Sequence, residues 1–259
     1  MSMEDFEDYE GLNNPTNEGI GQKGLSEAQR NYLCEVTPSE RDWLYMDYEH
    51  KADTIYNMEL RIDEMELTTD QIPQEYFEYK SDLKQLEQFQ NVECIDNCVQ
   101  VADYVYRSGI AERYMEGDVE TRKAIAQDYF NAIKGCMELE PDVPLTFCDM
   151  PEGTLGGYSP RTNSIELNSN YLEHADPRGL FKTIVHESEH AFQHKCVDNP
   201  LGCNVSPEVI AEWKYNMEHY KPASVYGMEA YRNQPIEKDA FDVEKYVFAQ
   251  VDKLKNLRD

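Results

Sequence analysis

The spacing of apolar residues changes near residue 141. From Leu25 to about Glu140, apolar and aromatic side chains recur every three or four residues, which is the spacing of one face of an α-helix. Short runs of strand-forming residues follow, and helical spacing returns after Asp176. The pattern predicts an α+β fold that is mainly helical, with a small antiparallel sheet.

Breaker and capping residues divide the helical region, residues 25–140. Thr37-Pro38-Ser39-Glu40 reads as a capping box that opens a long helix to about Leu67, and Gln71-Ile72-Pro73 ends it. Three more helices are predicted over residues 74–90, over 92–108 before Gly109, and from Asp118 to Gly135. Their apolar faces are expected to form a helical core.

Three short strands are predicted after residue 141, over 144–148, 156–158 and 164–168. Residues 159–163 contain the turn of a hairpin between the last two. Asp176-Pro177 then starts a helix through residue 193, and Ser206-Pro207 and Pro235 start two more, the last running to about Leu254. The hairpin therefore directly precedes the helix that begins at Pro177.

Composition narrows the possible partners. The chain has 259 residues, with 51 Asp and Glu against 24 Lys and Arg, and a net charge of −27. Such a surface repels a phosphate backbone, so no nucleic acid is expected, whereas a basic substrate would be attracted. Residues 1–24 are expected to form a flexible acidic tail, because residues 1–23 hold six acids and few apolar side chains.

The expected setting is the cytoplasm. No apolar run is long enough for a membrane span, and the acidic N-terminus does not resemble an export signal. Seven cysteines are scattered along the chain without C-x-x-C spacing, which fits a reducing compartment. We therefore expect no membrane partner.

The strongest chemical signal is His186-Glu187-Ser188-Glu189-His190, an H-E-x-x-H word within a largely apolar stretch. Histidines four apart lie on one helix face, so both imidazoles can reach one Zn²⁺, while Glu187 faces a water held by the metal. The alternative is an amphipathic helix that carries two histidines without binding metal.

A catalytic zinc site needs a third protein ligand. His194 lies too far along the same helix to meet a metal held by His186 and His190. Gln193 and Cys196 also replace the Gly and His of the H-E-x-x-H-x-x-G-x-x-H extension. A downstream glutamate is the remaining solution, with the candidates Glu208, Glu212, Glu218, Glu229 and Glu237.

The stretch from Tyr231 to Ala240 resembles the Y-x-x-x-P-x-E-x-x-A word that follows H-E-x-x-H-A-x-Q in a loosely defined set of gluzincin-like proteins, many from phage and mobile elements. The resemblance covers residues 156–241 and implies that residues 141–259 form a zincin-like metallopeptidase domain behind a helical N-terminal extension. It makes Glu237 the third metal ligand, ahead of Glu212 and then Glu208. Asp239 and Gln193 are candidates for supporting the ligands.

These residues predict a zinc-dependent endopeptidase in which Glu187 takes a proton from the attacking water. Tyr226 and Tyr231 are candidate donors to the developing oxyanion. The expected partner is a peptide or protein substrate, and the sequence leaves its identity and the oligomeric state open. The alternatives are an enzyme for a non-peptide amide and a non-enzymatic interaction or packaging protein on a zincin scaffold. Glu187 argues against the last, because a structural metal site needs no base.

Overall fold

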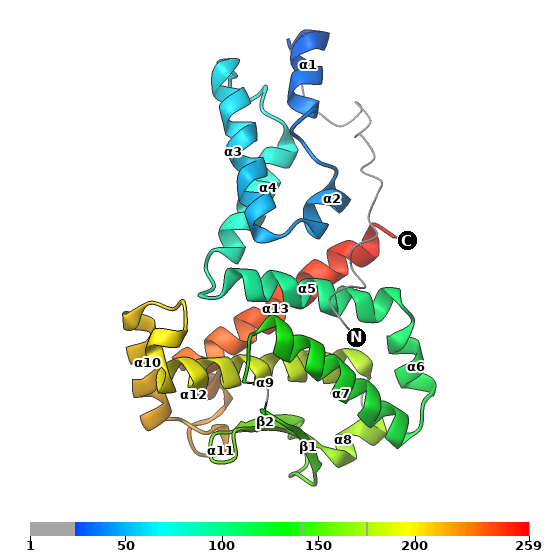
Figure 1. Ribbon diagram of the computed structural model, residues 1–259, viewed down its shortest axis with the longest axis vertical. Coiled ribbons are helices and arrows are strands. Elements are labelled where there is room, and N and C mark those ends of the chain that lie inside the picture. Colours follow the sequence, from blue (N-terminus) through cyan, green and yellow to red (C-terminus); the bar gives the residue numbers. More distant parts are fainter. Residues whose placement is uncertain (1–23, 141, 175, 259) are drawn as a thin grey trace. The chain divides into compact units, whose positions relative to one another are not determined.

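The computed structural model describes residues 24–140, 142–174 and 176–258, and it confirms a mainly helical α+β fold with one small sheet (Figure 1). The tail predicted over residues 1–24 lies outside the described residues apart from Gly24. The chain divides into two compact units, Met1–Asp96 with Asn256–Asp259, and Asn97–Lys255. Each unit is described by itself.

The first unit is a group of helices. It contains α1 (Glu27–Cys34), α2 (Glu40–Tyr45), α3 (Tyr48–Glu64), α4 (Gln74–Leu86) and the start of α5 (Val92–Arg107). Helix α3 packs against α1 and α4 (Figure 1). Trp43 and Tyr79 stack with ring centroids 4.5 Å apart and are almost fully buried, so this unit has its own aromatic core.

The single helix predicted from residue 37 to 67 is wrong, because the chain forms α2 and α3 instead. Met46 and Asp47 are extended, and the Asp47 side chain accepts a hydrogen bond from His50 N at 2.9 Å, which starts a new helix. The first cap is also shifted. Ser39 caps α2, whereas the Thr37 hydroxyl donates to Leu33 O of the preceding helix.

The second unit surrounds the helix that carries the H-E-x-x-H word. It comprises the rest of α5, then α6 (Ile110–Glu116), α7 (Val119–Cys136), β1 (Leu145–Cys148), β2 (Gly156–Ser159), β3 (Ser164–Asn168), α8 (Ser169–His174), α9 (Pro177–Asp198), the short 3-10 helix η2 (Pro200–Gly202), α10 (Pro207–Glu218), α11 (Ala223–Tyr226), α12 (Met228–Arg232) and most of α13 (Pro235–Asn256).

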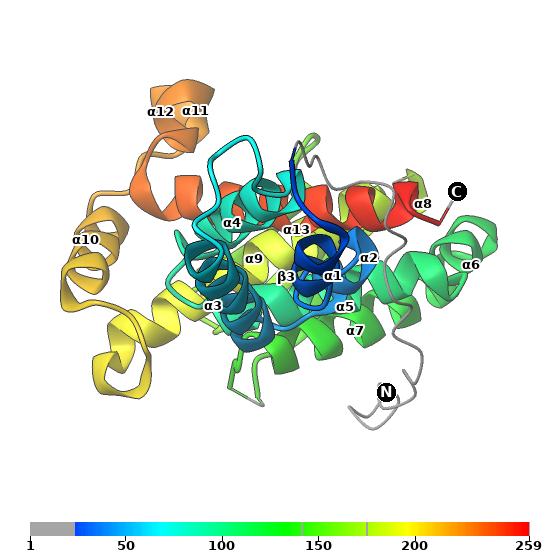
Figure 2. The same cartoon turned by 90° about the horizontal axis from the view of Figure 1, so that it is seen from above.

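Helix α9 is the centre of this unit. It packs against α6, α7, α10, β2 and β3, and Figure 2 shows α9 between α7 and α13 of the same unit. Helices α6 and α7 thus belong with the helix that bears the motif, although the sequence grouped them with the N-terminal region. The change from helical to strand pattern near residue 141 falls inside a compact unit, because packing partners cannot be seen from local periodicity.

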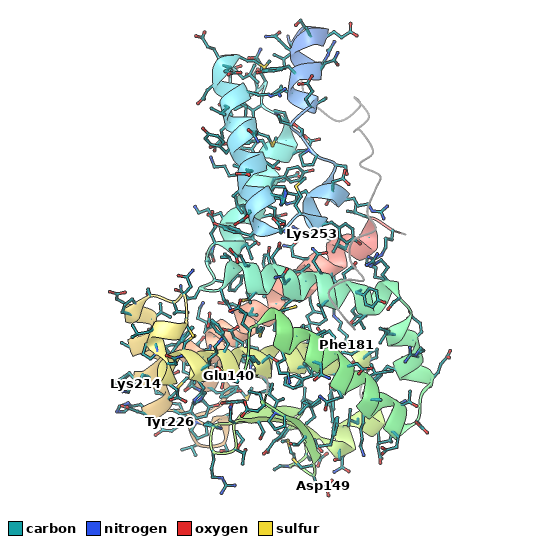
Figure 3. All side chains as sticks on the ribbon, in the orientation of Figure 1. Glu140, Asp149, Phe181, Lys214, Tyr226 and Lys253 are labelled. Carbon is teal, nitrogen blue, oxygen red and sulfur yellow. The ribbon has the colours of Figure 1, made fainter. Side chains whose placement is uncertain are left out.

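Local chemistry explains why α9 begins where it does and why it is buried. The Asp176 side chain accepts a hydrogen bond from Gly179 N at 2.9 Å, and Pro177 occupies the first turn. From Leu180 to Gln193 nearly every side chain is buried. Phe181, labelled in Figure 3, contacts the rings of Tyr106, Tyr114 and Tyr129. The motif therefore lies on a fixed support.

The sheet is mixed, which corrects the prediction of an antiparallel sheet. Its strand order is β1-β3-β2, with β2 antiparallel and β1 parallel to β3. The hairpin turn sets the β2 pairing, whereas β1 joins the opposite edge of β3. A Cβ at Gly156 would lie 2.8 Å from Glu166 O and 3.0 Å from Thr183 Cγ2, so glycine permits β2 to pack closely between β3 and α9.

Among the described helices, none combines the length and the apolar composition that a membrane crossing requires.

A buried ion pair in the first unit gives a test of its fold. Lys51 Nζ lies 2.5 Å from Asp96 Oδ1, and their side chains are only 7% and 3% exposed. Burial raises the pKa of Asp96 although Lys51 opposes the shift. Lys51→Met should lower the free energy of unfolding by about 3 kcal/mol or more, because it leaves a carboxylate buried without its cation.

Chemical denaturation measures this loss. The matched control is Lys80→Met, which removes a pair with Glu59 at the same 2.5 Å separation but with side chains 52% and 39% exposed. That variant should lose at most about 1 kcal/mol. Equal losses for the two variants would contradict the buried arrangement.

Candidate metal centre

Three buried side chains of the second unit converge on one point. His186 and His190 lie one turn apart on α9, and Glu237 lies in the first turn of α13. His186 Nε2 is 3.4 Å from Glu237 Oε2, and His190 Nε2 is 3.5 Å from Glu237 Oε1. One ligand atom from each residue lies within 4.8 Å of the other two. The structure thus brings together the three predicted metal ligands.

The two nitrogen–oxygen distances, 3.4 and 3.5 Å, are close to those between ligand atoms around a small cation. Bonds of about 2.0 to 2.2 Å at tetrahedral angles place ligand atoms roughly 3.3 to 3.5 Å apart. Glu237 Oε2 is buried and has no hydrogen-bond partner among the described residues, although a buried carboxylate oxygen requires one. Two imidazole nitrogens with a carboxylate form a donor set for a divalent transition metal. The group can therefore bind a metal ion.

The electrostatics of the cluster favour positive charge at this point. Burial would lower the pKa of His186, but Glu237 and Glu244 outweigh it and raise the pKa to about 10. Burial would likewise raise the pKa of Glu237, but His186 and His190 hold it well below its usual range. The carboxylates thus favour positive charge at this point, which a protonated imidazole or a metal ion can carry.

The outer nitrogen of His190 has a fixed partner. Its Nδ1 lies 3.0 Å from Gln193 Oε1, and Gln193 Nε2 donates to Ile236 O and to Asp239 Oδ2 at 3.0 and 2.9 Å. Gln193 and Asp239 were the two candidates for supporting the ligands. The structure places Gln193 against a ligand and Asp239 behind Gln193, which leaves His190 Nε2 directed at the cluster.

Tyr220 is a site residue that the sequence did not reveal. Its hydroxyl donates to Glu237 Oε1 at 2.7 Å. Tyr231 faces the same carboxylate, and burial followed by the nearby Glu237 raises the pKa of both phenols. Tyr226, the other predicted phenol, is 58% exposed on α11 (Figure 3), and no hydrogen bond or ring contact among the described residues joins it to the ligands.

A set of amide hydrogen bonds places Tyr220 beside Glu237. Gln234 Oε1 accepts from Lys221 N at 3.0 Å and from Asn216 Nδ2 at 3.2 Å, and Gln234 Nε2 donates to Lys221 O. Asn216 Oδ1 accepts from Ile236 N, the residue before the ligand. The loop that contains α11 and α12 is thus closed at its base. Nothing in the local sequence around Tyr220 signals this, because the contacts span 13 to 20 residues.

The other glutamates fall into two groups. Glu187 follows His186 on α9 and is only 8% exposed, and its charge helps to raise the pKa values of His186, Tyr220 and Tyr231. Glu208 and Glu212, the alternatives for the third ligand, are exposed on α10 and do not join the cluster.

Comparison with known proteins adds no relative. The chain matches no family model, no curated protein and no solved structure.

Replacing Glu237 tests the third ligand. If the group binds a metal ion such as zinc, Glu237→Ala should weaken that binding on the order of a hundredfold, because a direct metal bond is lost. Glu212→Ala and Glu208→Ala remove exposed carboxylates and should leave the affinity nearly unchanged. Competition against a chromophoric chelator measures all three dissociation constants, and circular dichroism checks that each variant is folded. A loss confined to Glu212→Ala would move the third ligand to α10.

Proposed function

We propose that this chain is a zinc-dependent endopeptidase of the gluzincin type, with the zinc held by His186, His190 and Glu237. The observation that supports this most directly is the convergence of these side chains on one buried point beside Glu187. The order of the residues agrees with the resemblance, in which both histidines and the base lie on one helix and the third ligand on a later one.

Zinc, when bound at this point, acts as a Lewis acid that lowers the pKa of a water ligand and polarises a substrate carbonyl. Glu187 is the base of the proposed reaction. It takes a proton from the attacking water and delivers it to the amine that leaves when the peptide bond breaks, so it serves both steps. Its burial strengthens its electrostatic coupling to the reacting groups.

Tyr220 and Tyr231 are the proposed donors to the oxyanion that develops on the substrate carbonyl. Their raised pKa values keep both phenols protonated at neutral pH, so they remain hydrogen-bond donors. In the structure the Tyr220 hydroxyl donates to Glu237, so in the proposed reaction this hydrogen bond is exchanged for one to the oxyanion. Tyr226 has no part in this proposal.

Strand β2 supports peptide as the substrate. It forms an outer edge of the sheet and packs against α9, which carries the base. An extended peptide can add to such an edge through main-chain hydrogen bonds. A Cβ added at Gly157 would have no atom within 4 Å, so the space beside this residue is open. With a net charge of −27, the protein favours a basic substrate.

A test of the base compares two isosteric changes on α9. Glu187→Gln should retain zinc and the fold but reduce turnover by several orders of magnitude, because an amide cannot accept the water proton. Glu189→Gln alters the other glutamate of the motif, which is also buried, and should retain most activity. The measurement is mass spectrometry of products from an unbiased peptide library, with zinc content determined for each protein.

Two results would oppose the proposal in different ways. Substantial hydrolysis by Glu187→Gln would show that another group is the base. A zinc-loaded parent protein that cleaves none of the library would favour the interaction or packaging role, in which the zincin scaffold is kept without catalysis.

A further inference from the structure

Glu244 on α13 lies between two cationic or potentially cationic side chains of α9. Its Oε1 accepts a hydrogen bond from Lys182 Nζ at 2.8 Å, and its Oε2 lies 3.5 Å from His186 Nδ1. Lys182 and His186 are four residues apart, so they lie on one face of α9. One carboxylate is therefore divided between a lysine and a candidate metal ligand.

Helix α13 presents carboxylates to both nitrogens of the His186 ring. Glu237 lies 3.4 Å from Nε2 and Glu244 lies 3.5 Å from Nδ1. The two glutamates are seven residues apart, which is about two helical turns and places them on the same face. Phe241 lies between them in sequence and packs its ring 4.4 Å from the imidazole. The imidazole thus has a carboxylate near each nitrogen and an aromatic ring against it.

The contact at Nδ1 determines which nitrogen is available to a metal. A carboxylate at Nδ1 favours the tautomer that carries its proton there, and this leaves the lone pair on Nε2. Nε2 is the nitrogen that faces Glu237. His190 has a neutral amide, Gln193, in the corresponding place. Of the two histidines, only His186 therefore has a charged group, the Glu244 carboxylate, next to its Nδ1.

We propose that Glu244, held by Lys182, is a positioning residue that fixes the tautomer and orientation of His186 and so raises the metal affinity of the site. This inference rests on the proposed metal centre and adds a residue that neither the motif nor the resemblance identified. Lys182 occupies one oxygen of Glu244, which directs the other oxygen to the histidine.

A purely structural role has to be distinguished, because the same contact also joins α9 to α13. The chain offers a matched control in Arg178 and Asp252, which join the same two helices. Arg178 donates to both Asp252 oxygens at 2.8 and 2.9 Å, and the pair touches neither histidine. Removing Asp252 takes away a helix contact without changing the surroundings of His186.

The experiment measures zinc affinity by chelator competition for the full chain and for Glu244→Leu, Glu244→Gln, Asp252→Leu and Asp252→Asn. Glu244→Leu should weaken zinc binding roughly 10- to 100-fold, as expected for the loss of a carboxylate that supports a ligand histidine. Glu244→Gln keeps an acceptor oxygen but loses the charge, so it should show a smaller loss, about three- to tenfold. Both Asp252 variants should bind zinc within about twofold of the parent.

The absorption spectrum of the cobalt-loaded protein gives a second readout, because it reports ligand geometry. It should change in the Glu244 variants and stay constant in the Asp252 variants. If Glu244→Leu does not fold, the isosteric Glu244→Gln decides, and unchanged affinity with an unchanged cobalt spectrum contradicts the inference. Equal losses in the Glu244 and Asp252 variants would also contradict it, since helix pairing would explain them. A parent chain that binds no metal would instead overturn the proposed centre itself.

Discussion

The structure of the second unit depends on the burial of several charges between α9 and α13. Glu237 and Glu244 lie within 3.5 Å of imidazole nitrogens of His186, and isolated carboxylates in such a buried place are costly. Pairing with the histidines and with Lys182 offsets that cost. Because these groups come from two helices, the helices must keep a fixed register. The apolar packing around α9 and the closed base of the α11 and α12 loop both maintain it.

Much of the fold could be predicted from the sequence because its signals are local. Capping residues and prolines located α7, α9, α10 and α13, and short runs of strand-forming residues located all three strands. The break at Asp47 was missed because apolar spacing continues across it, and only the cap to His50 reveals the new helix. The parallel pairing of β1 and the assignment of α6 and α7 to the second unit depend on distant contacts, which local pattern does not contain.

The site shows the same difference between local signals and contacts of residues that are distant in sequence. His186, Glu187 and His190 were predictable because one helical turn relates them, and Glu237 because the Y-x-x-x-P-x-E-x-x-A word marks it. Tyr220 and Glu244 could not be predicted in this way. Each reaches the cluster only because elements that are distant in sequence pack together. A sign was available for Glu244, which follows Glu237 by two turns on the same face of α13. Tyr226 lies near Glu237 in sequence, but its side chain is exposed.

The most direct test of this account is X-ray absorption, combined with elemental analysis, on protein purified without added metal. The account predicts about one zinc per chain, bound only by nitrogen and oxygen at about 2.0 to 2.2 Å, with the outer-shell scattering of two imidazoles. A folded protein with far less than one zinc per chain would contradict it. So would a sulfur shell near 2.3 Å, because cysteines would then hold the metal in place of His186, His190 and Glu237.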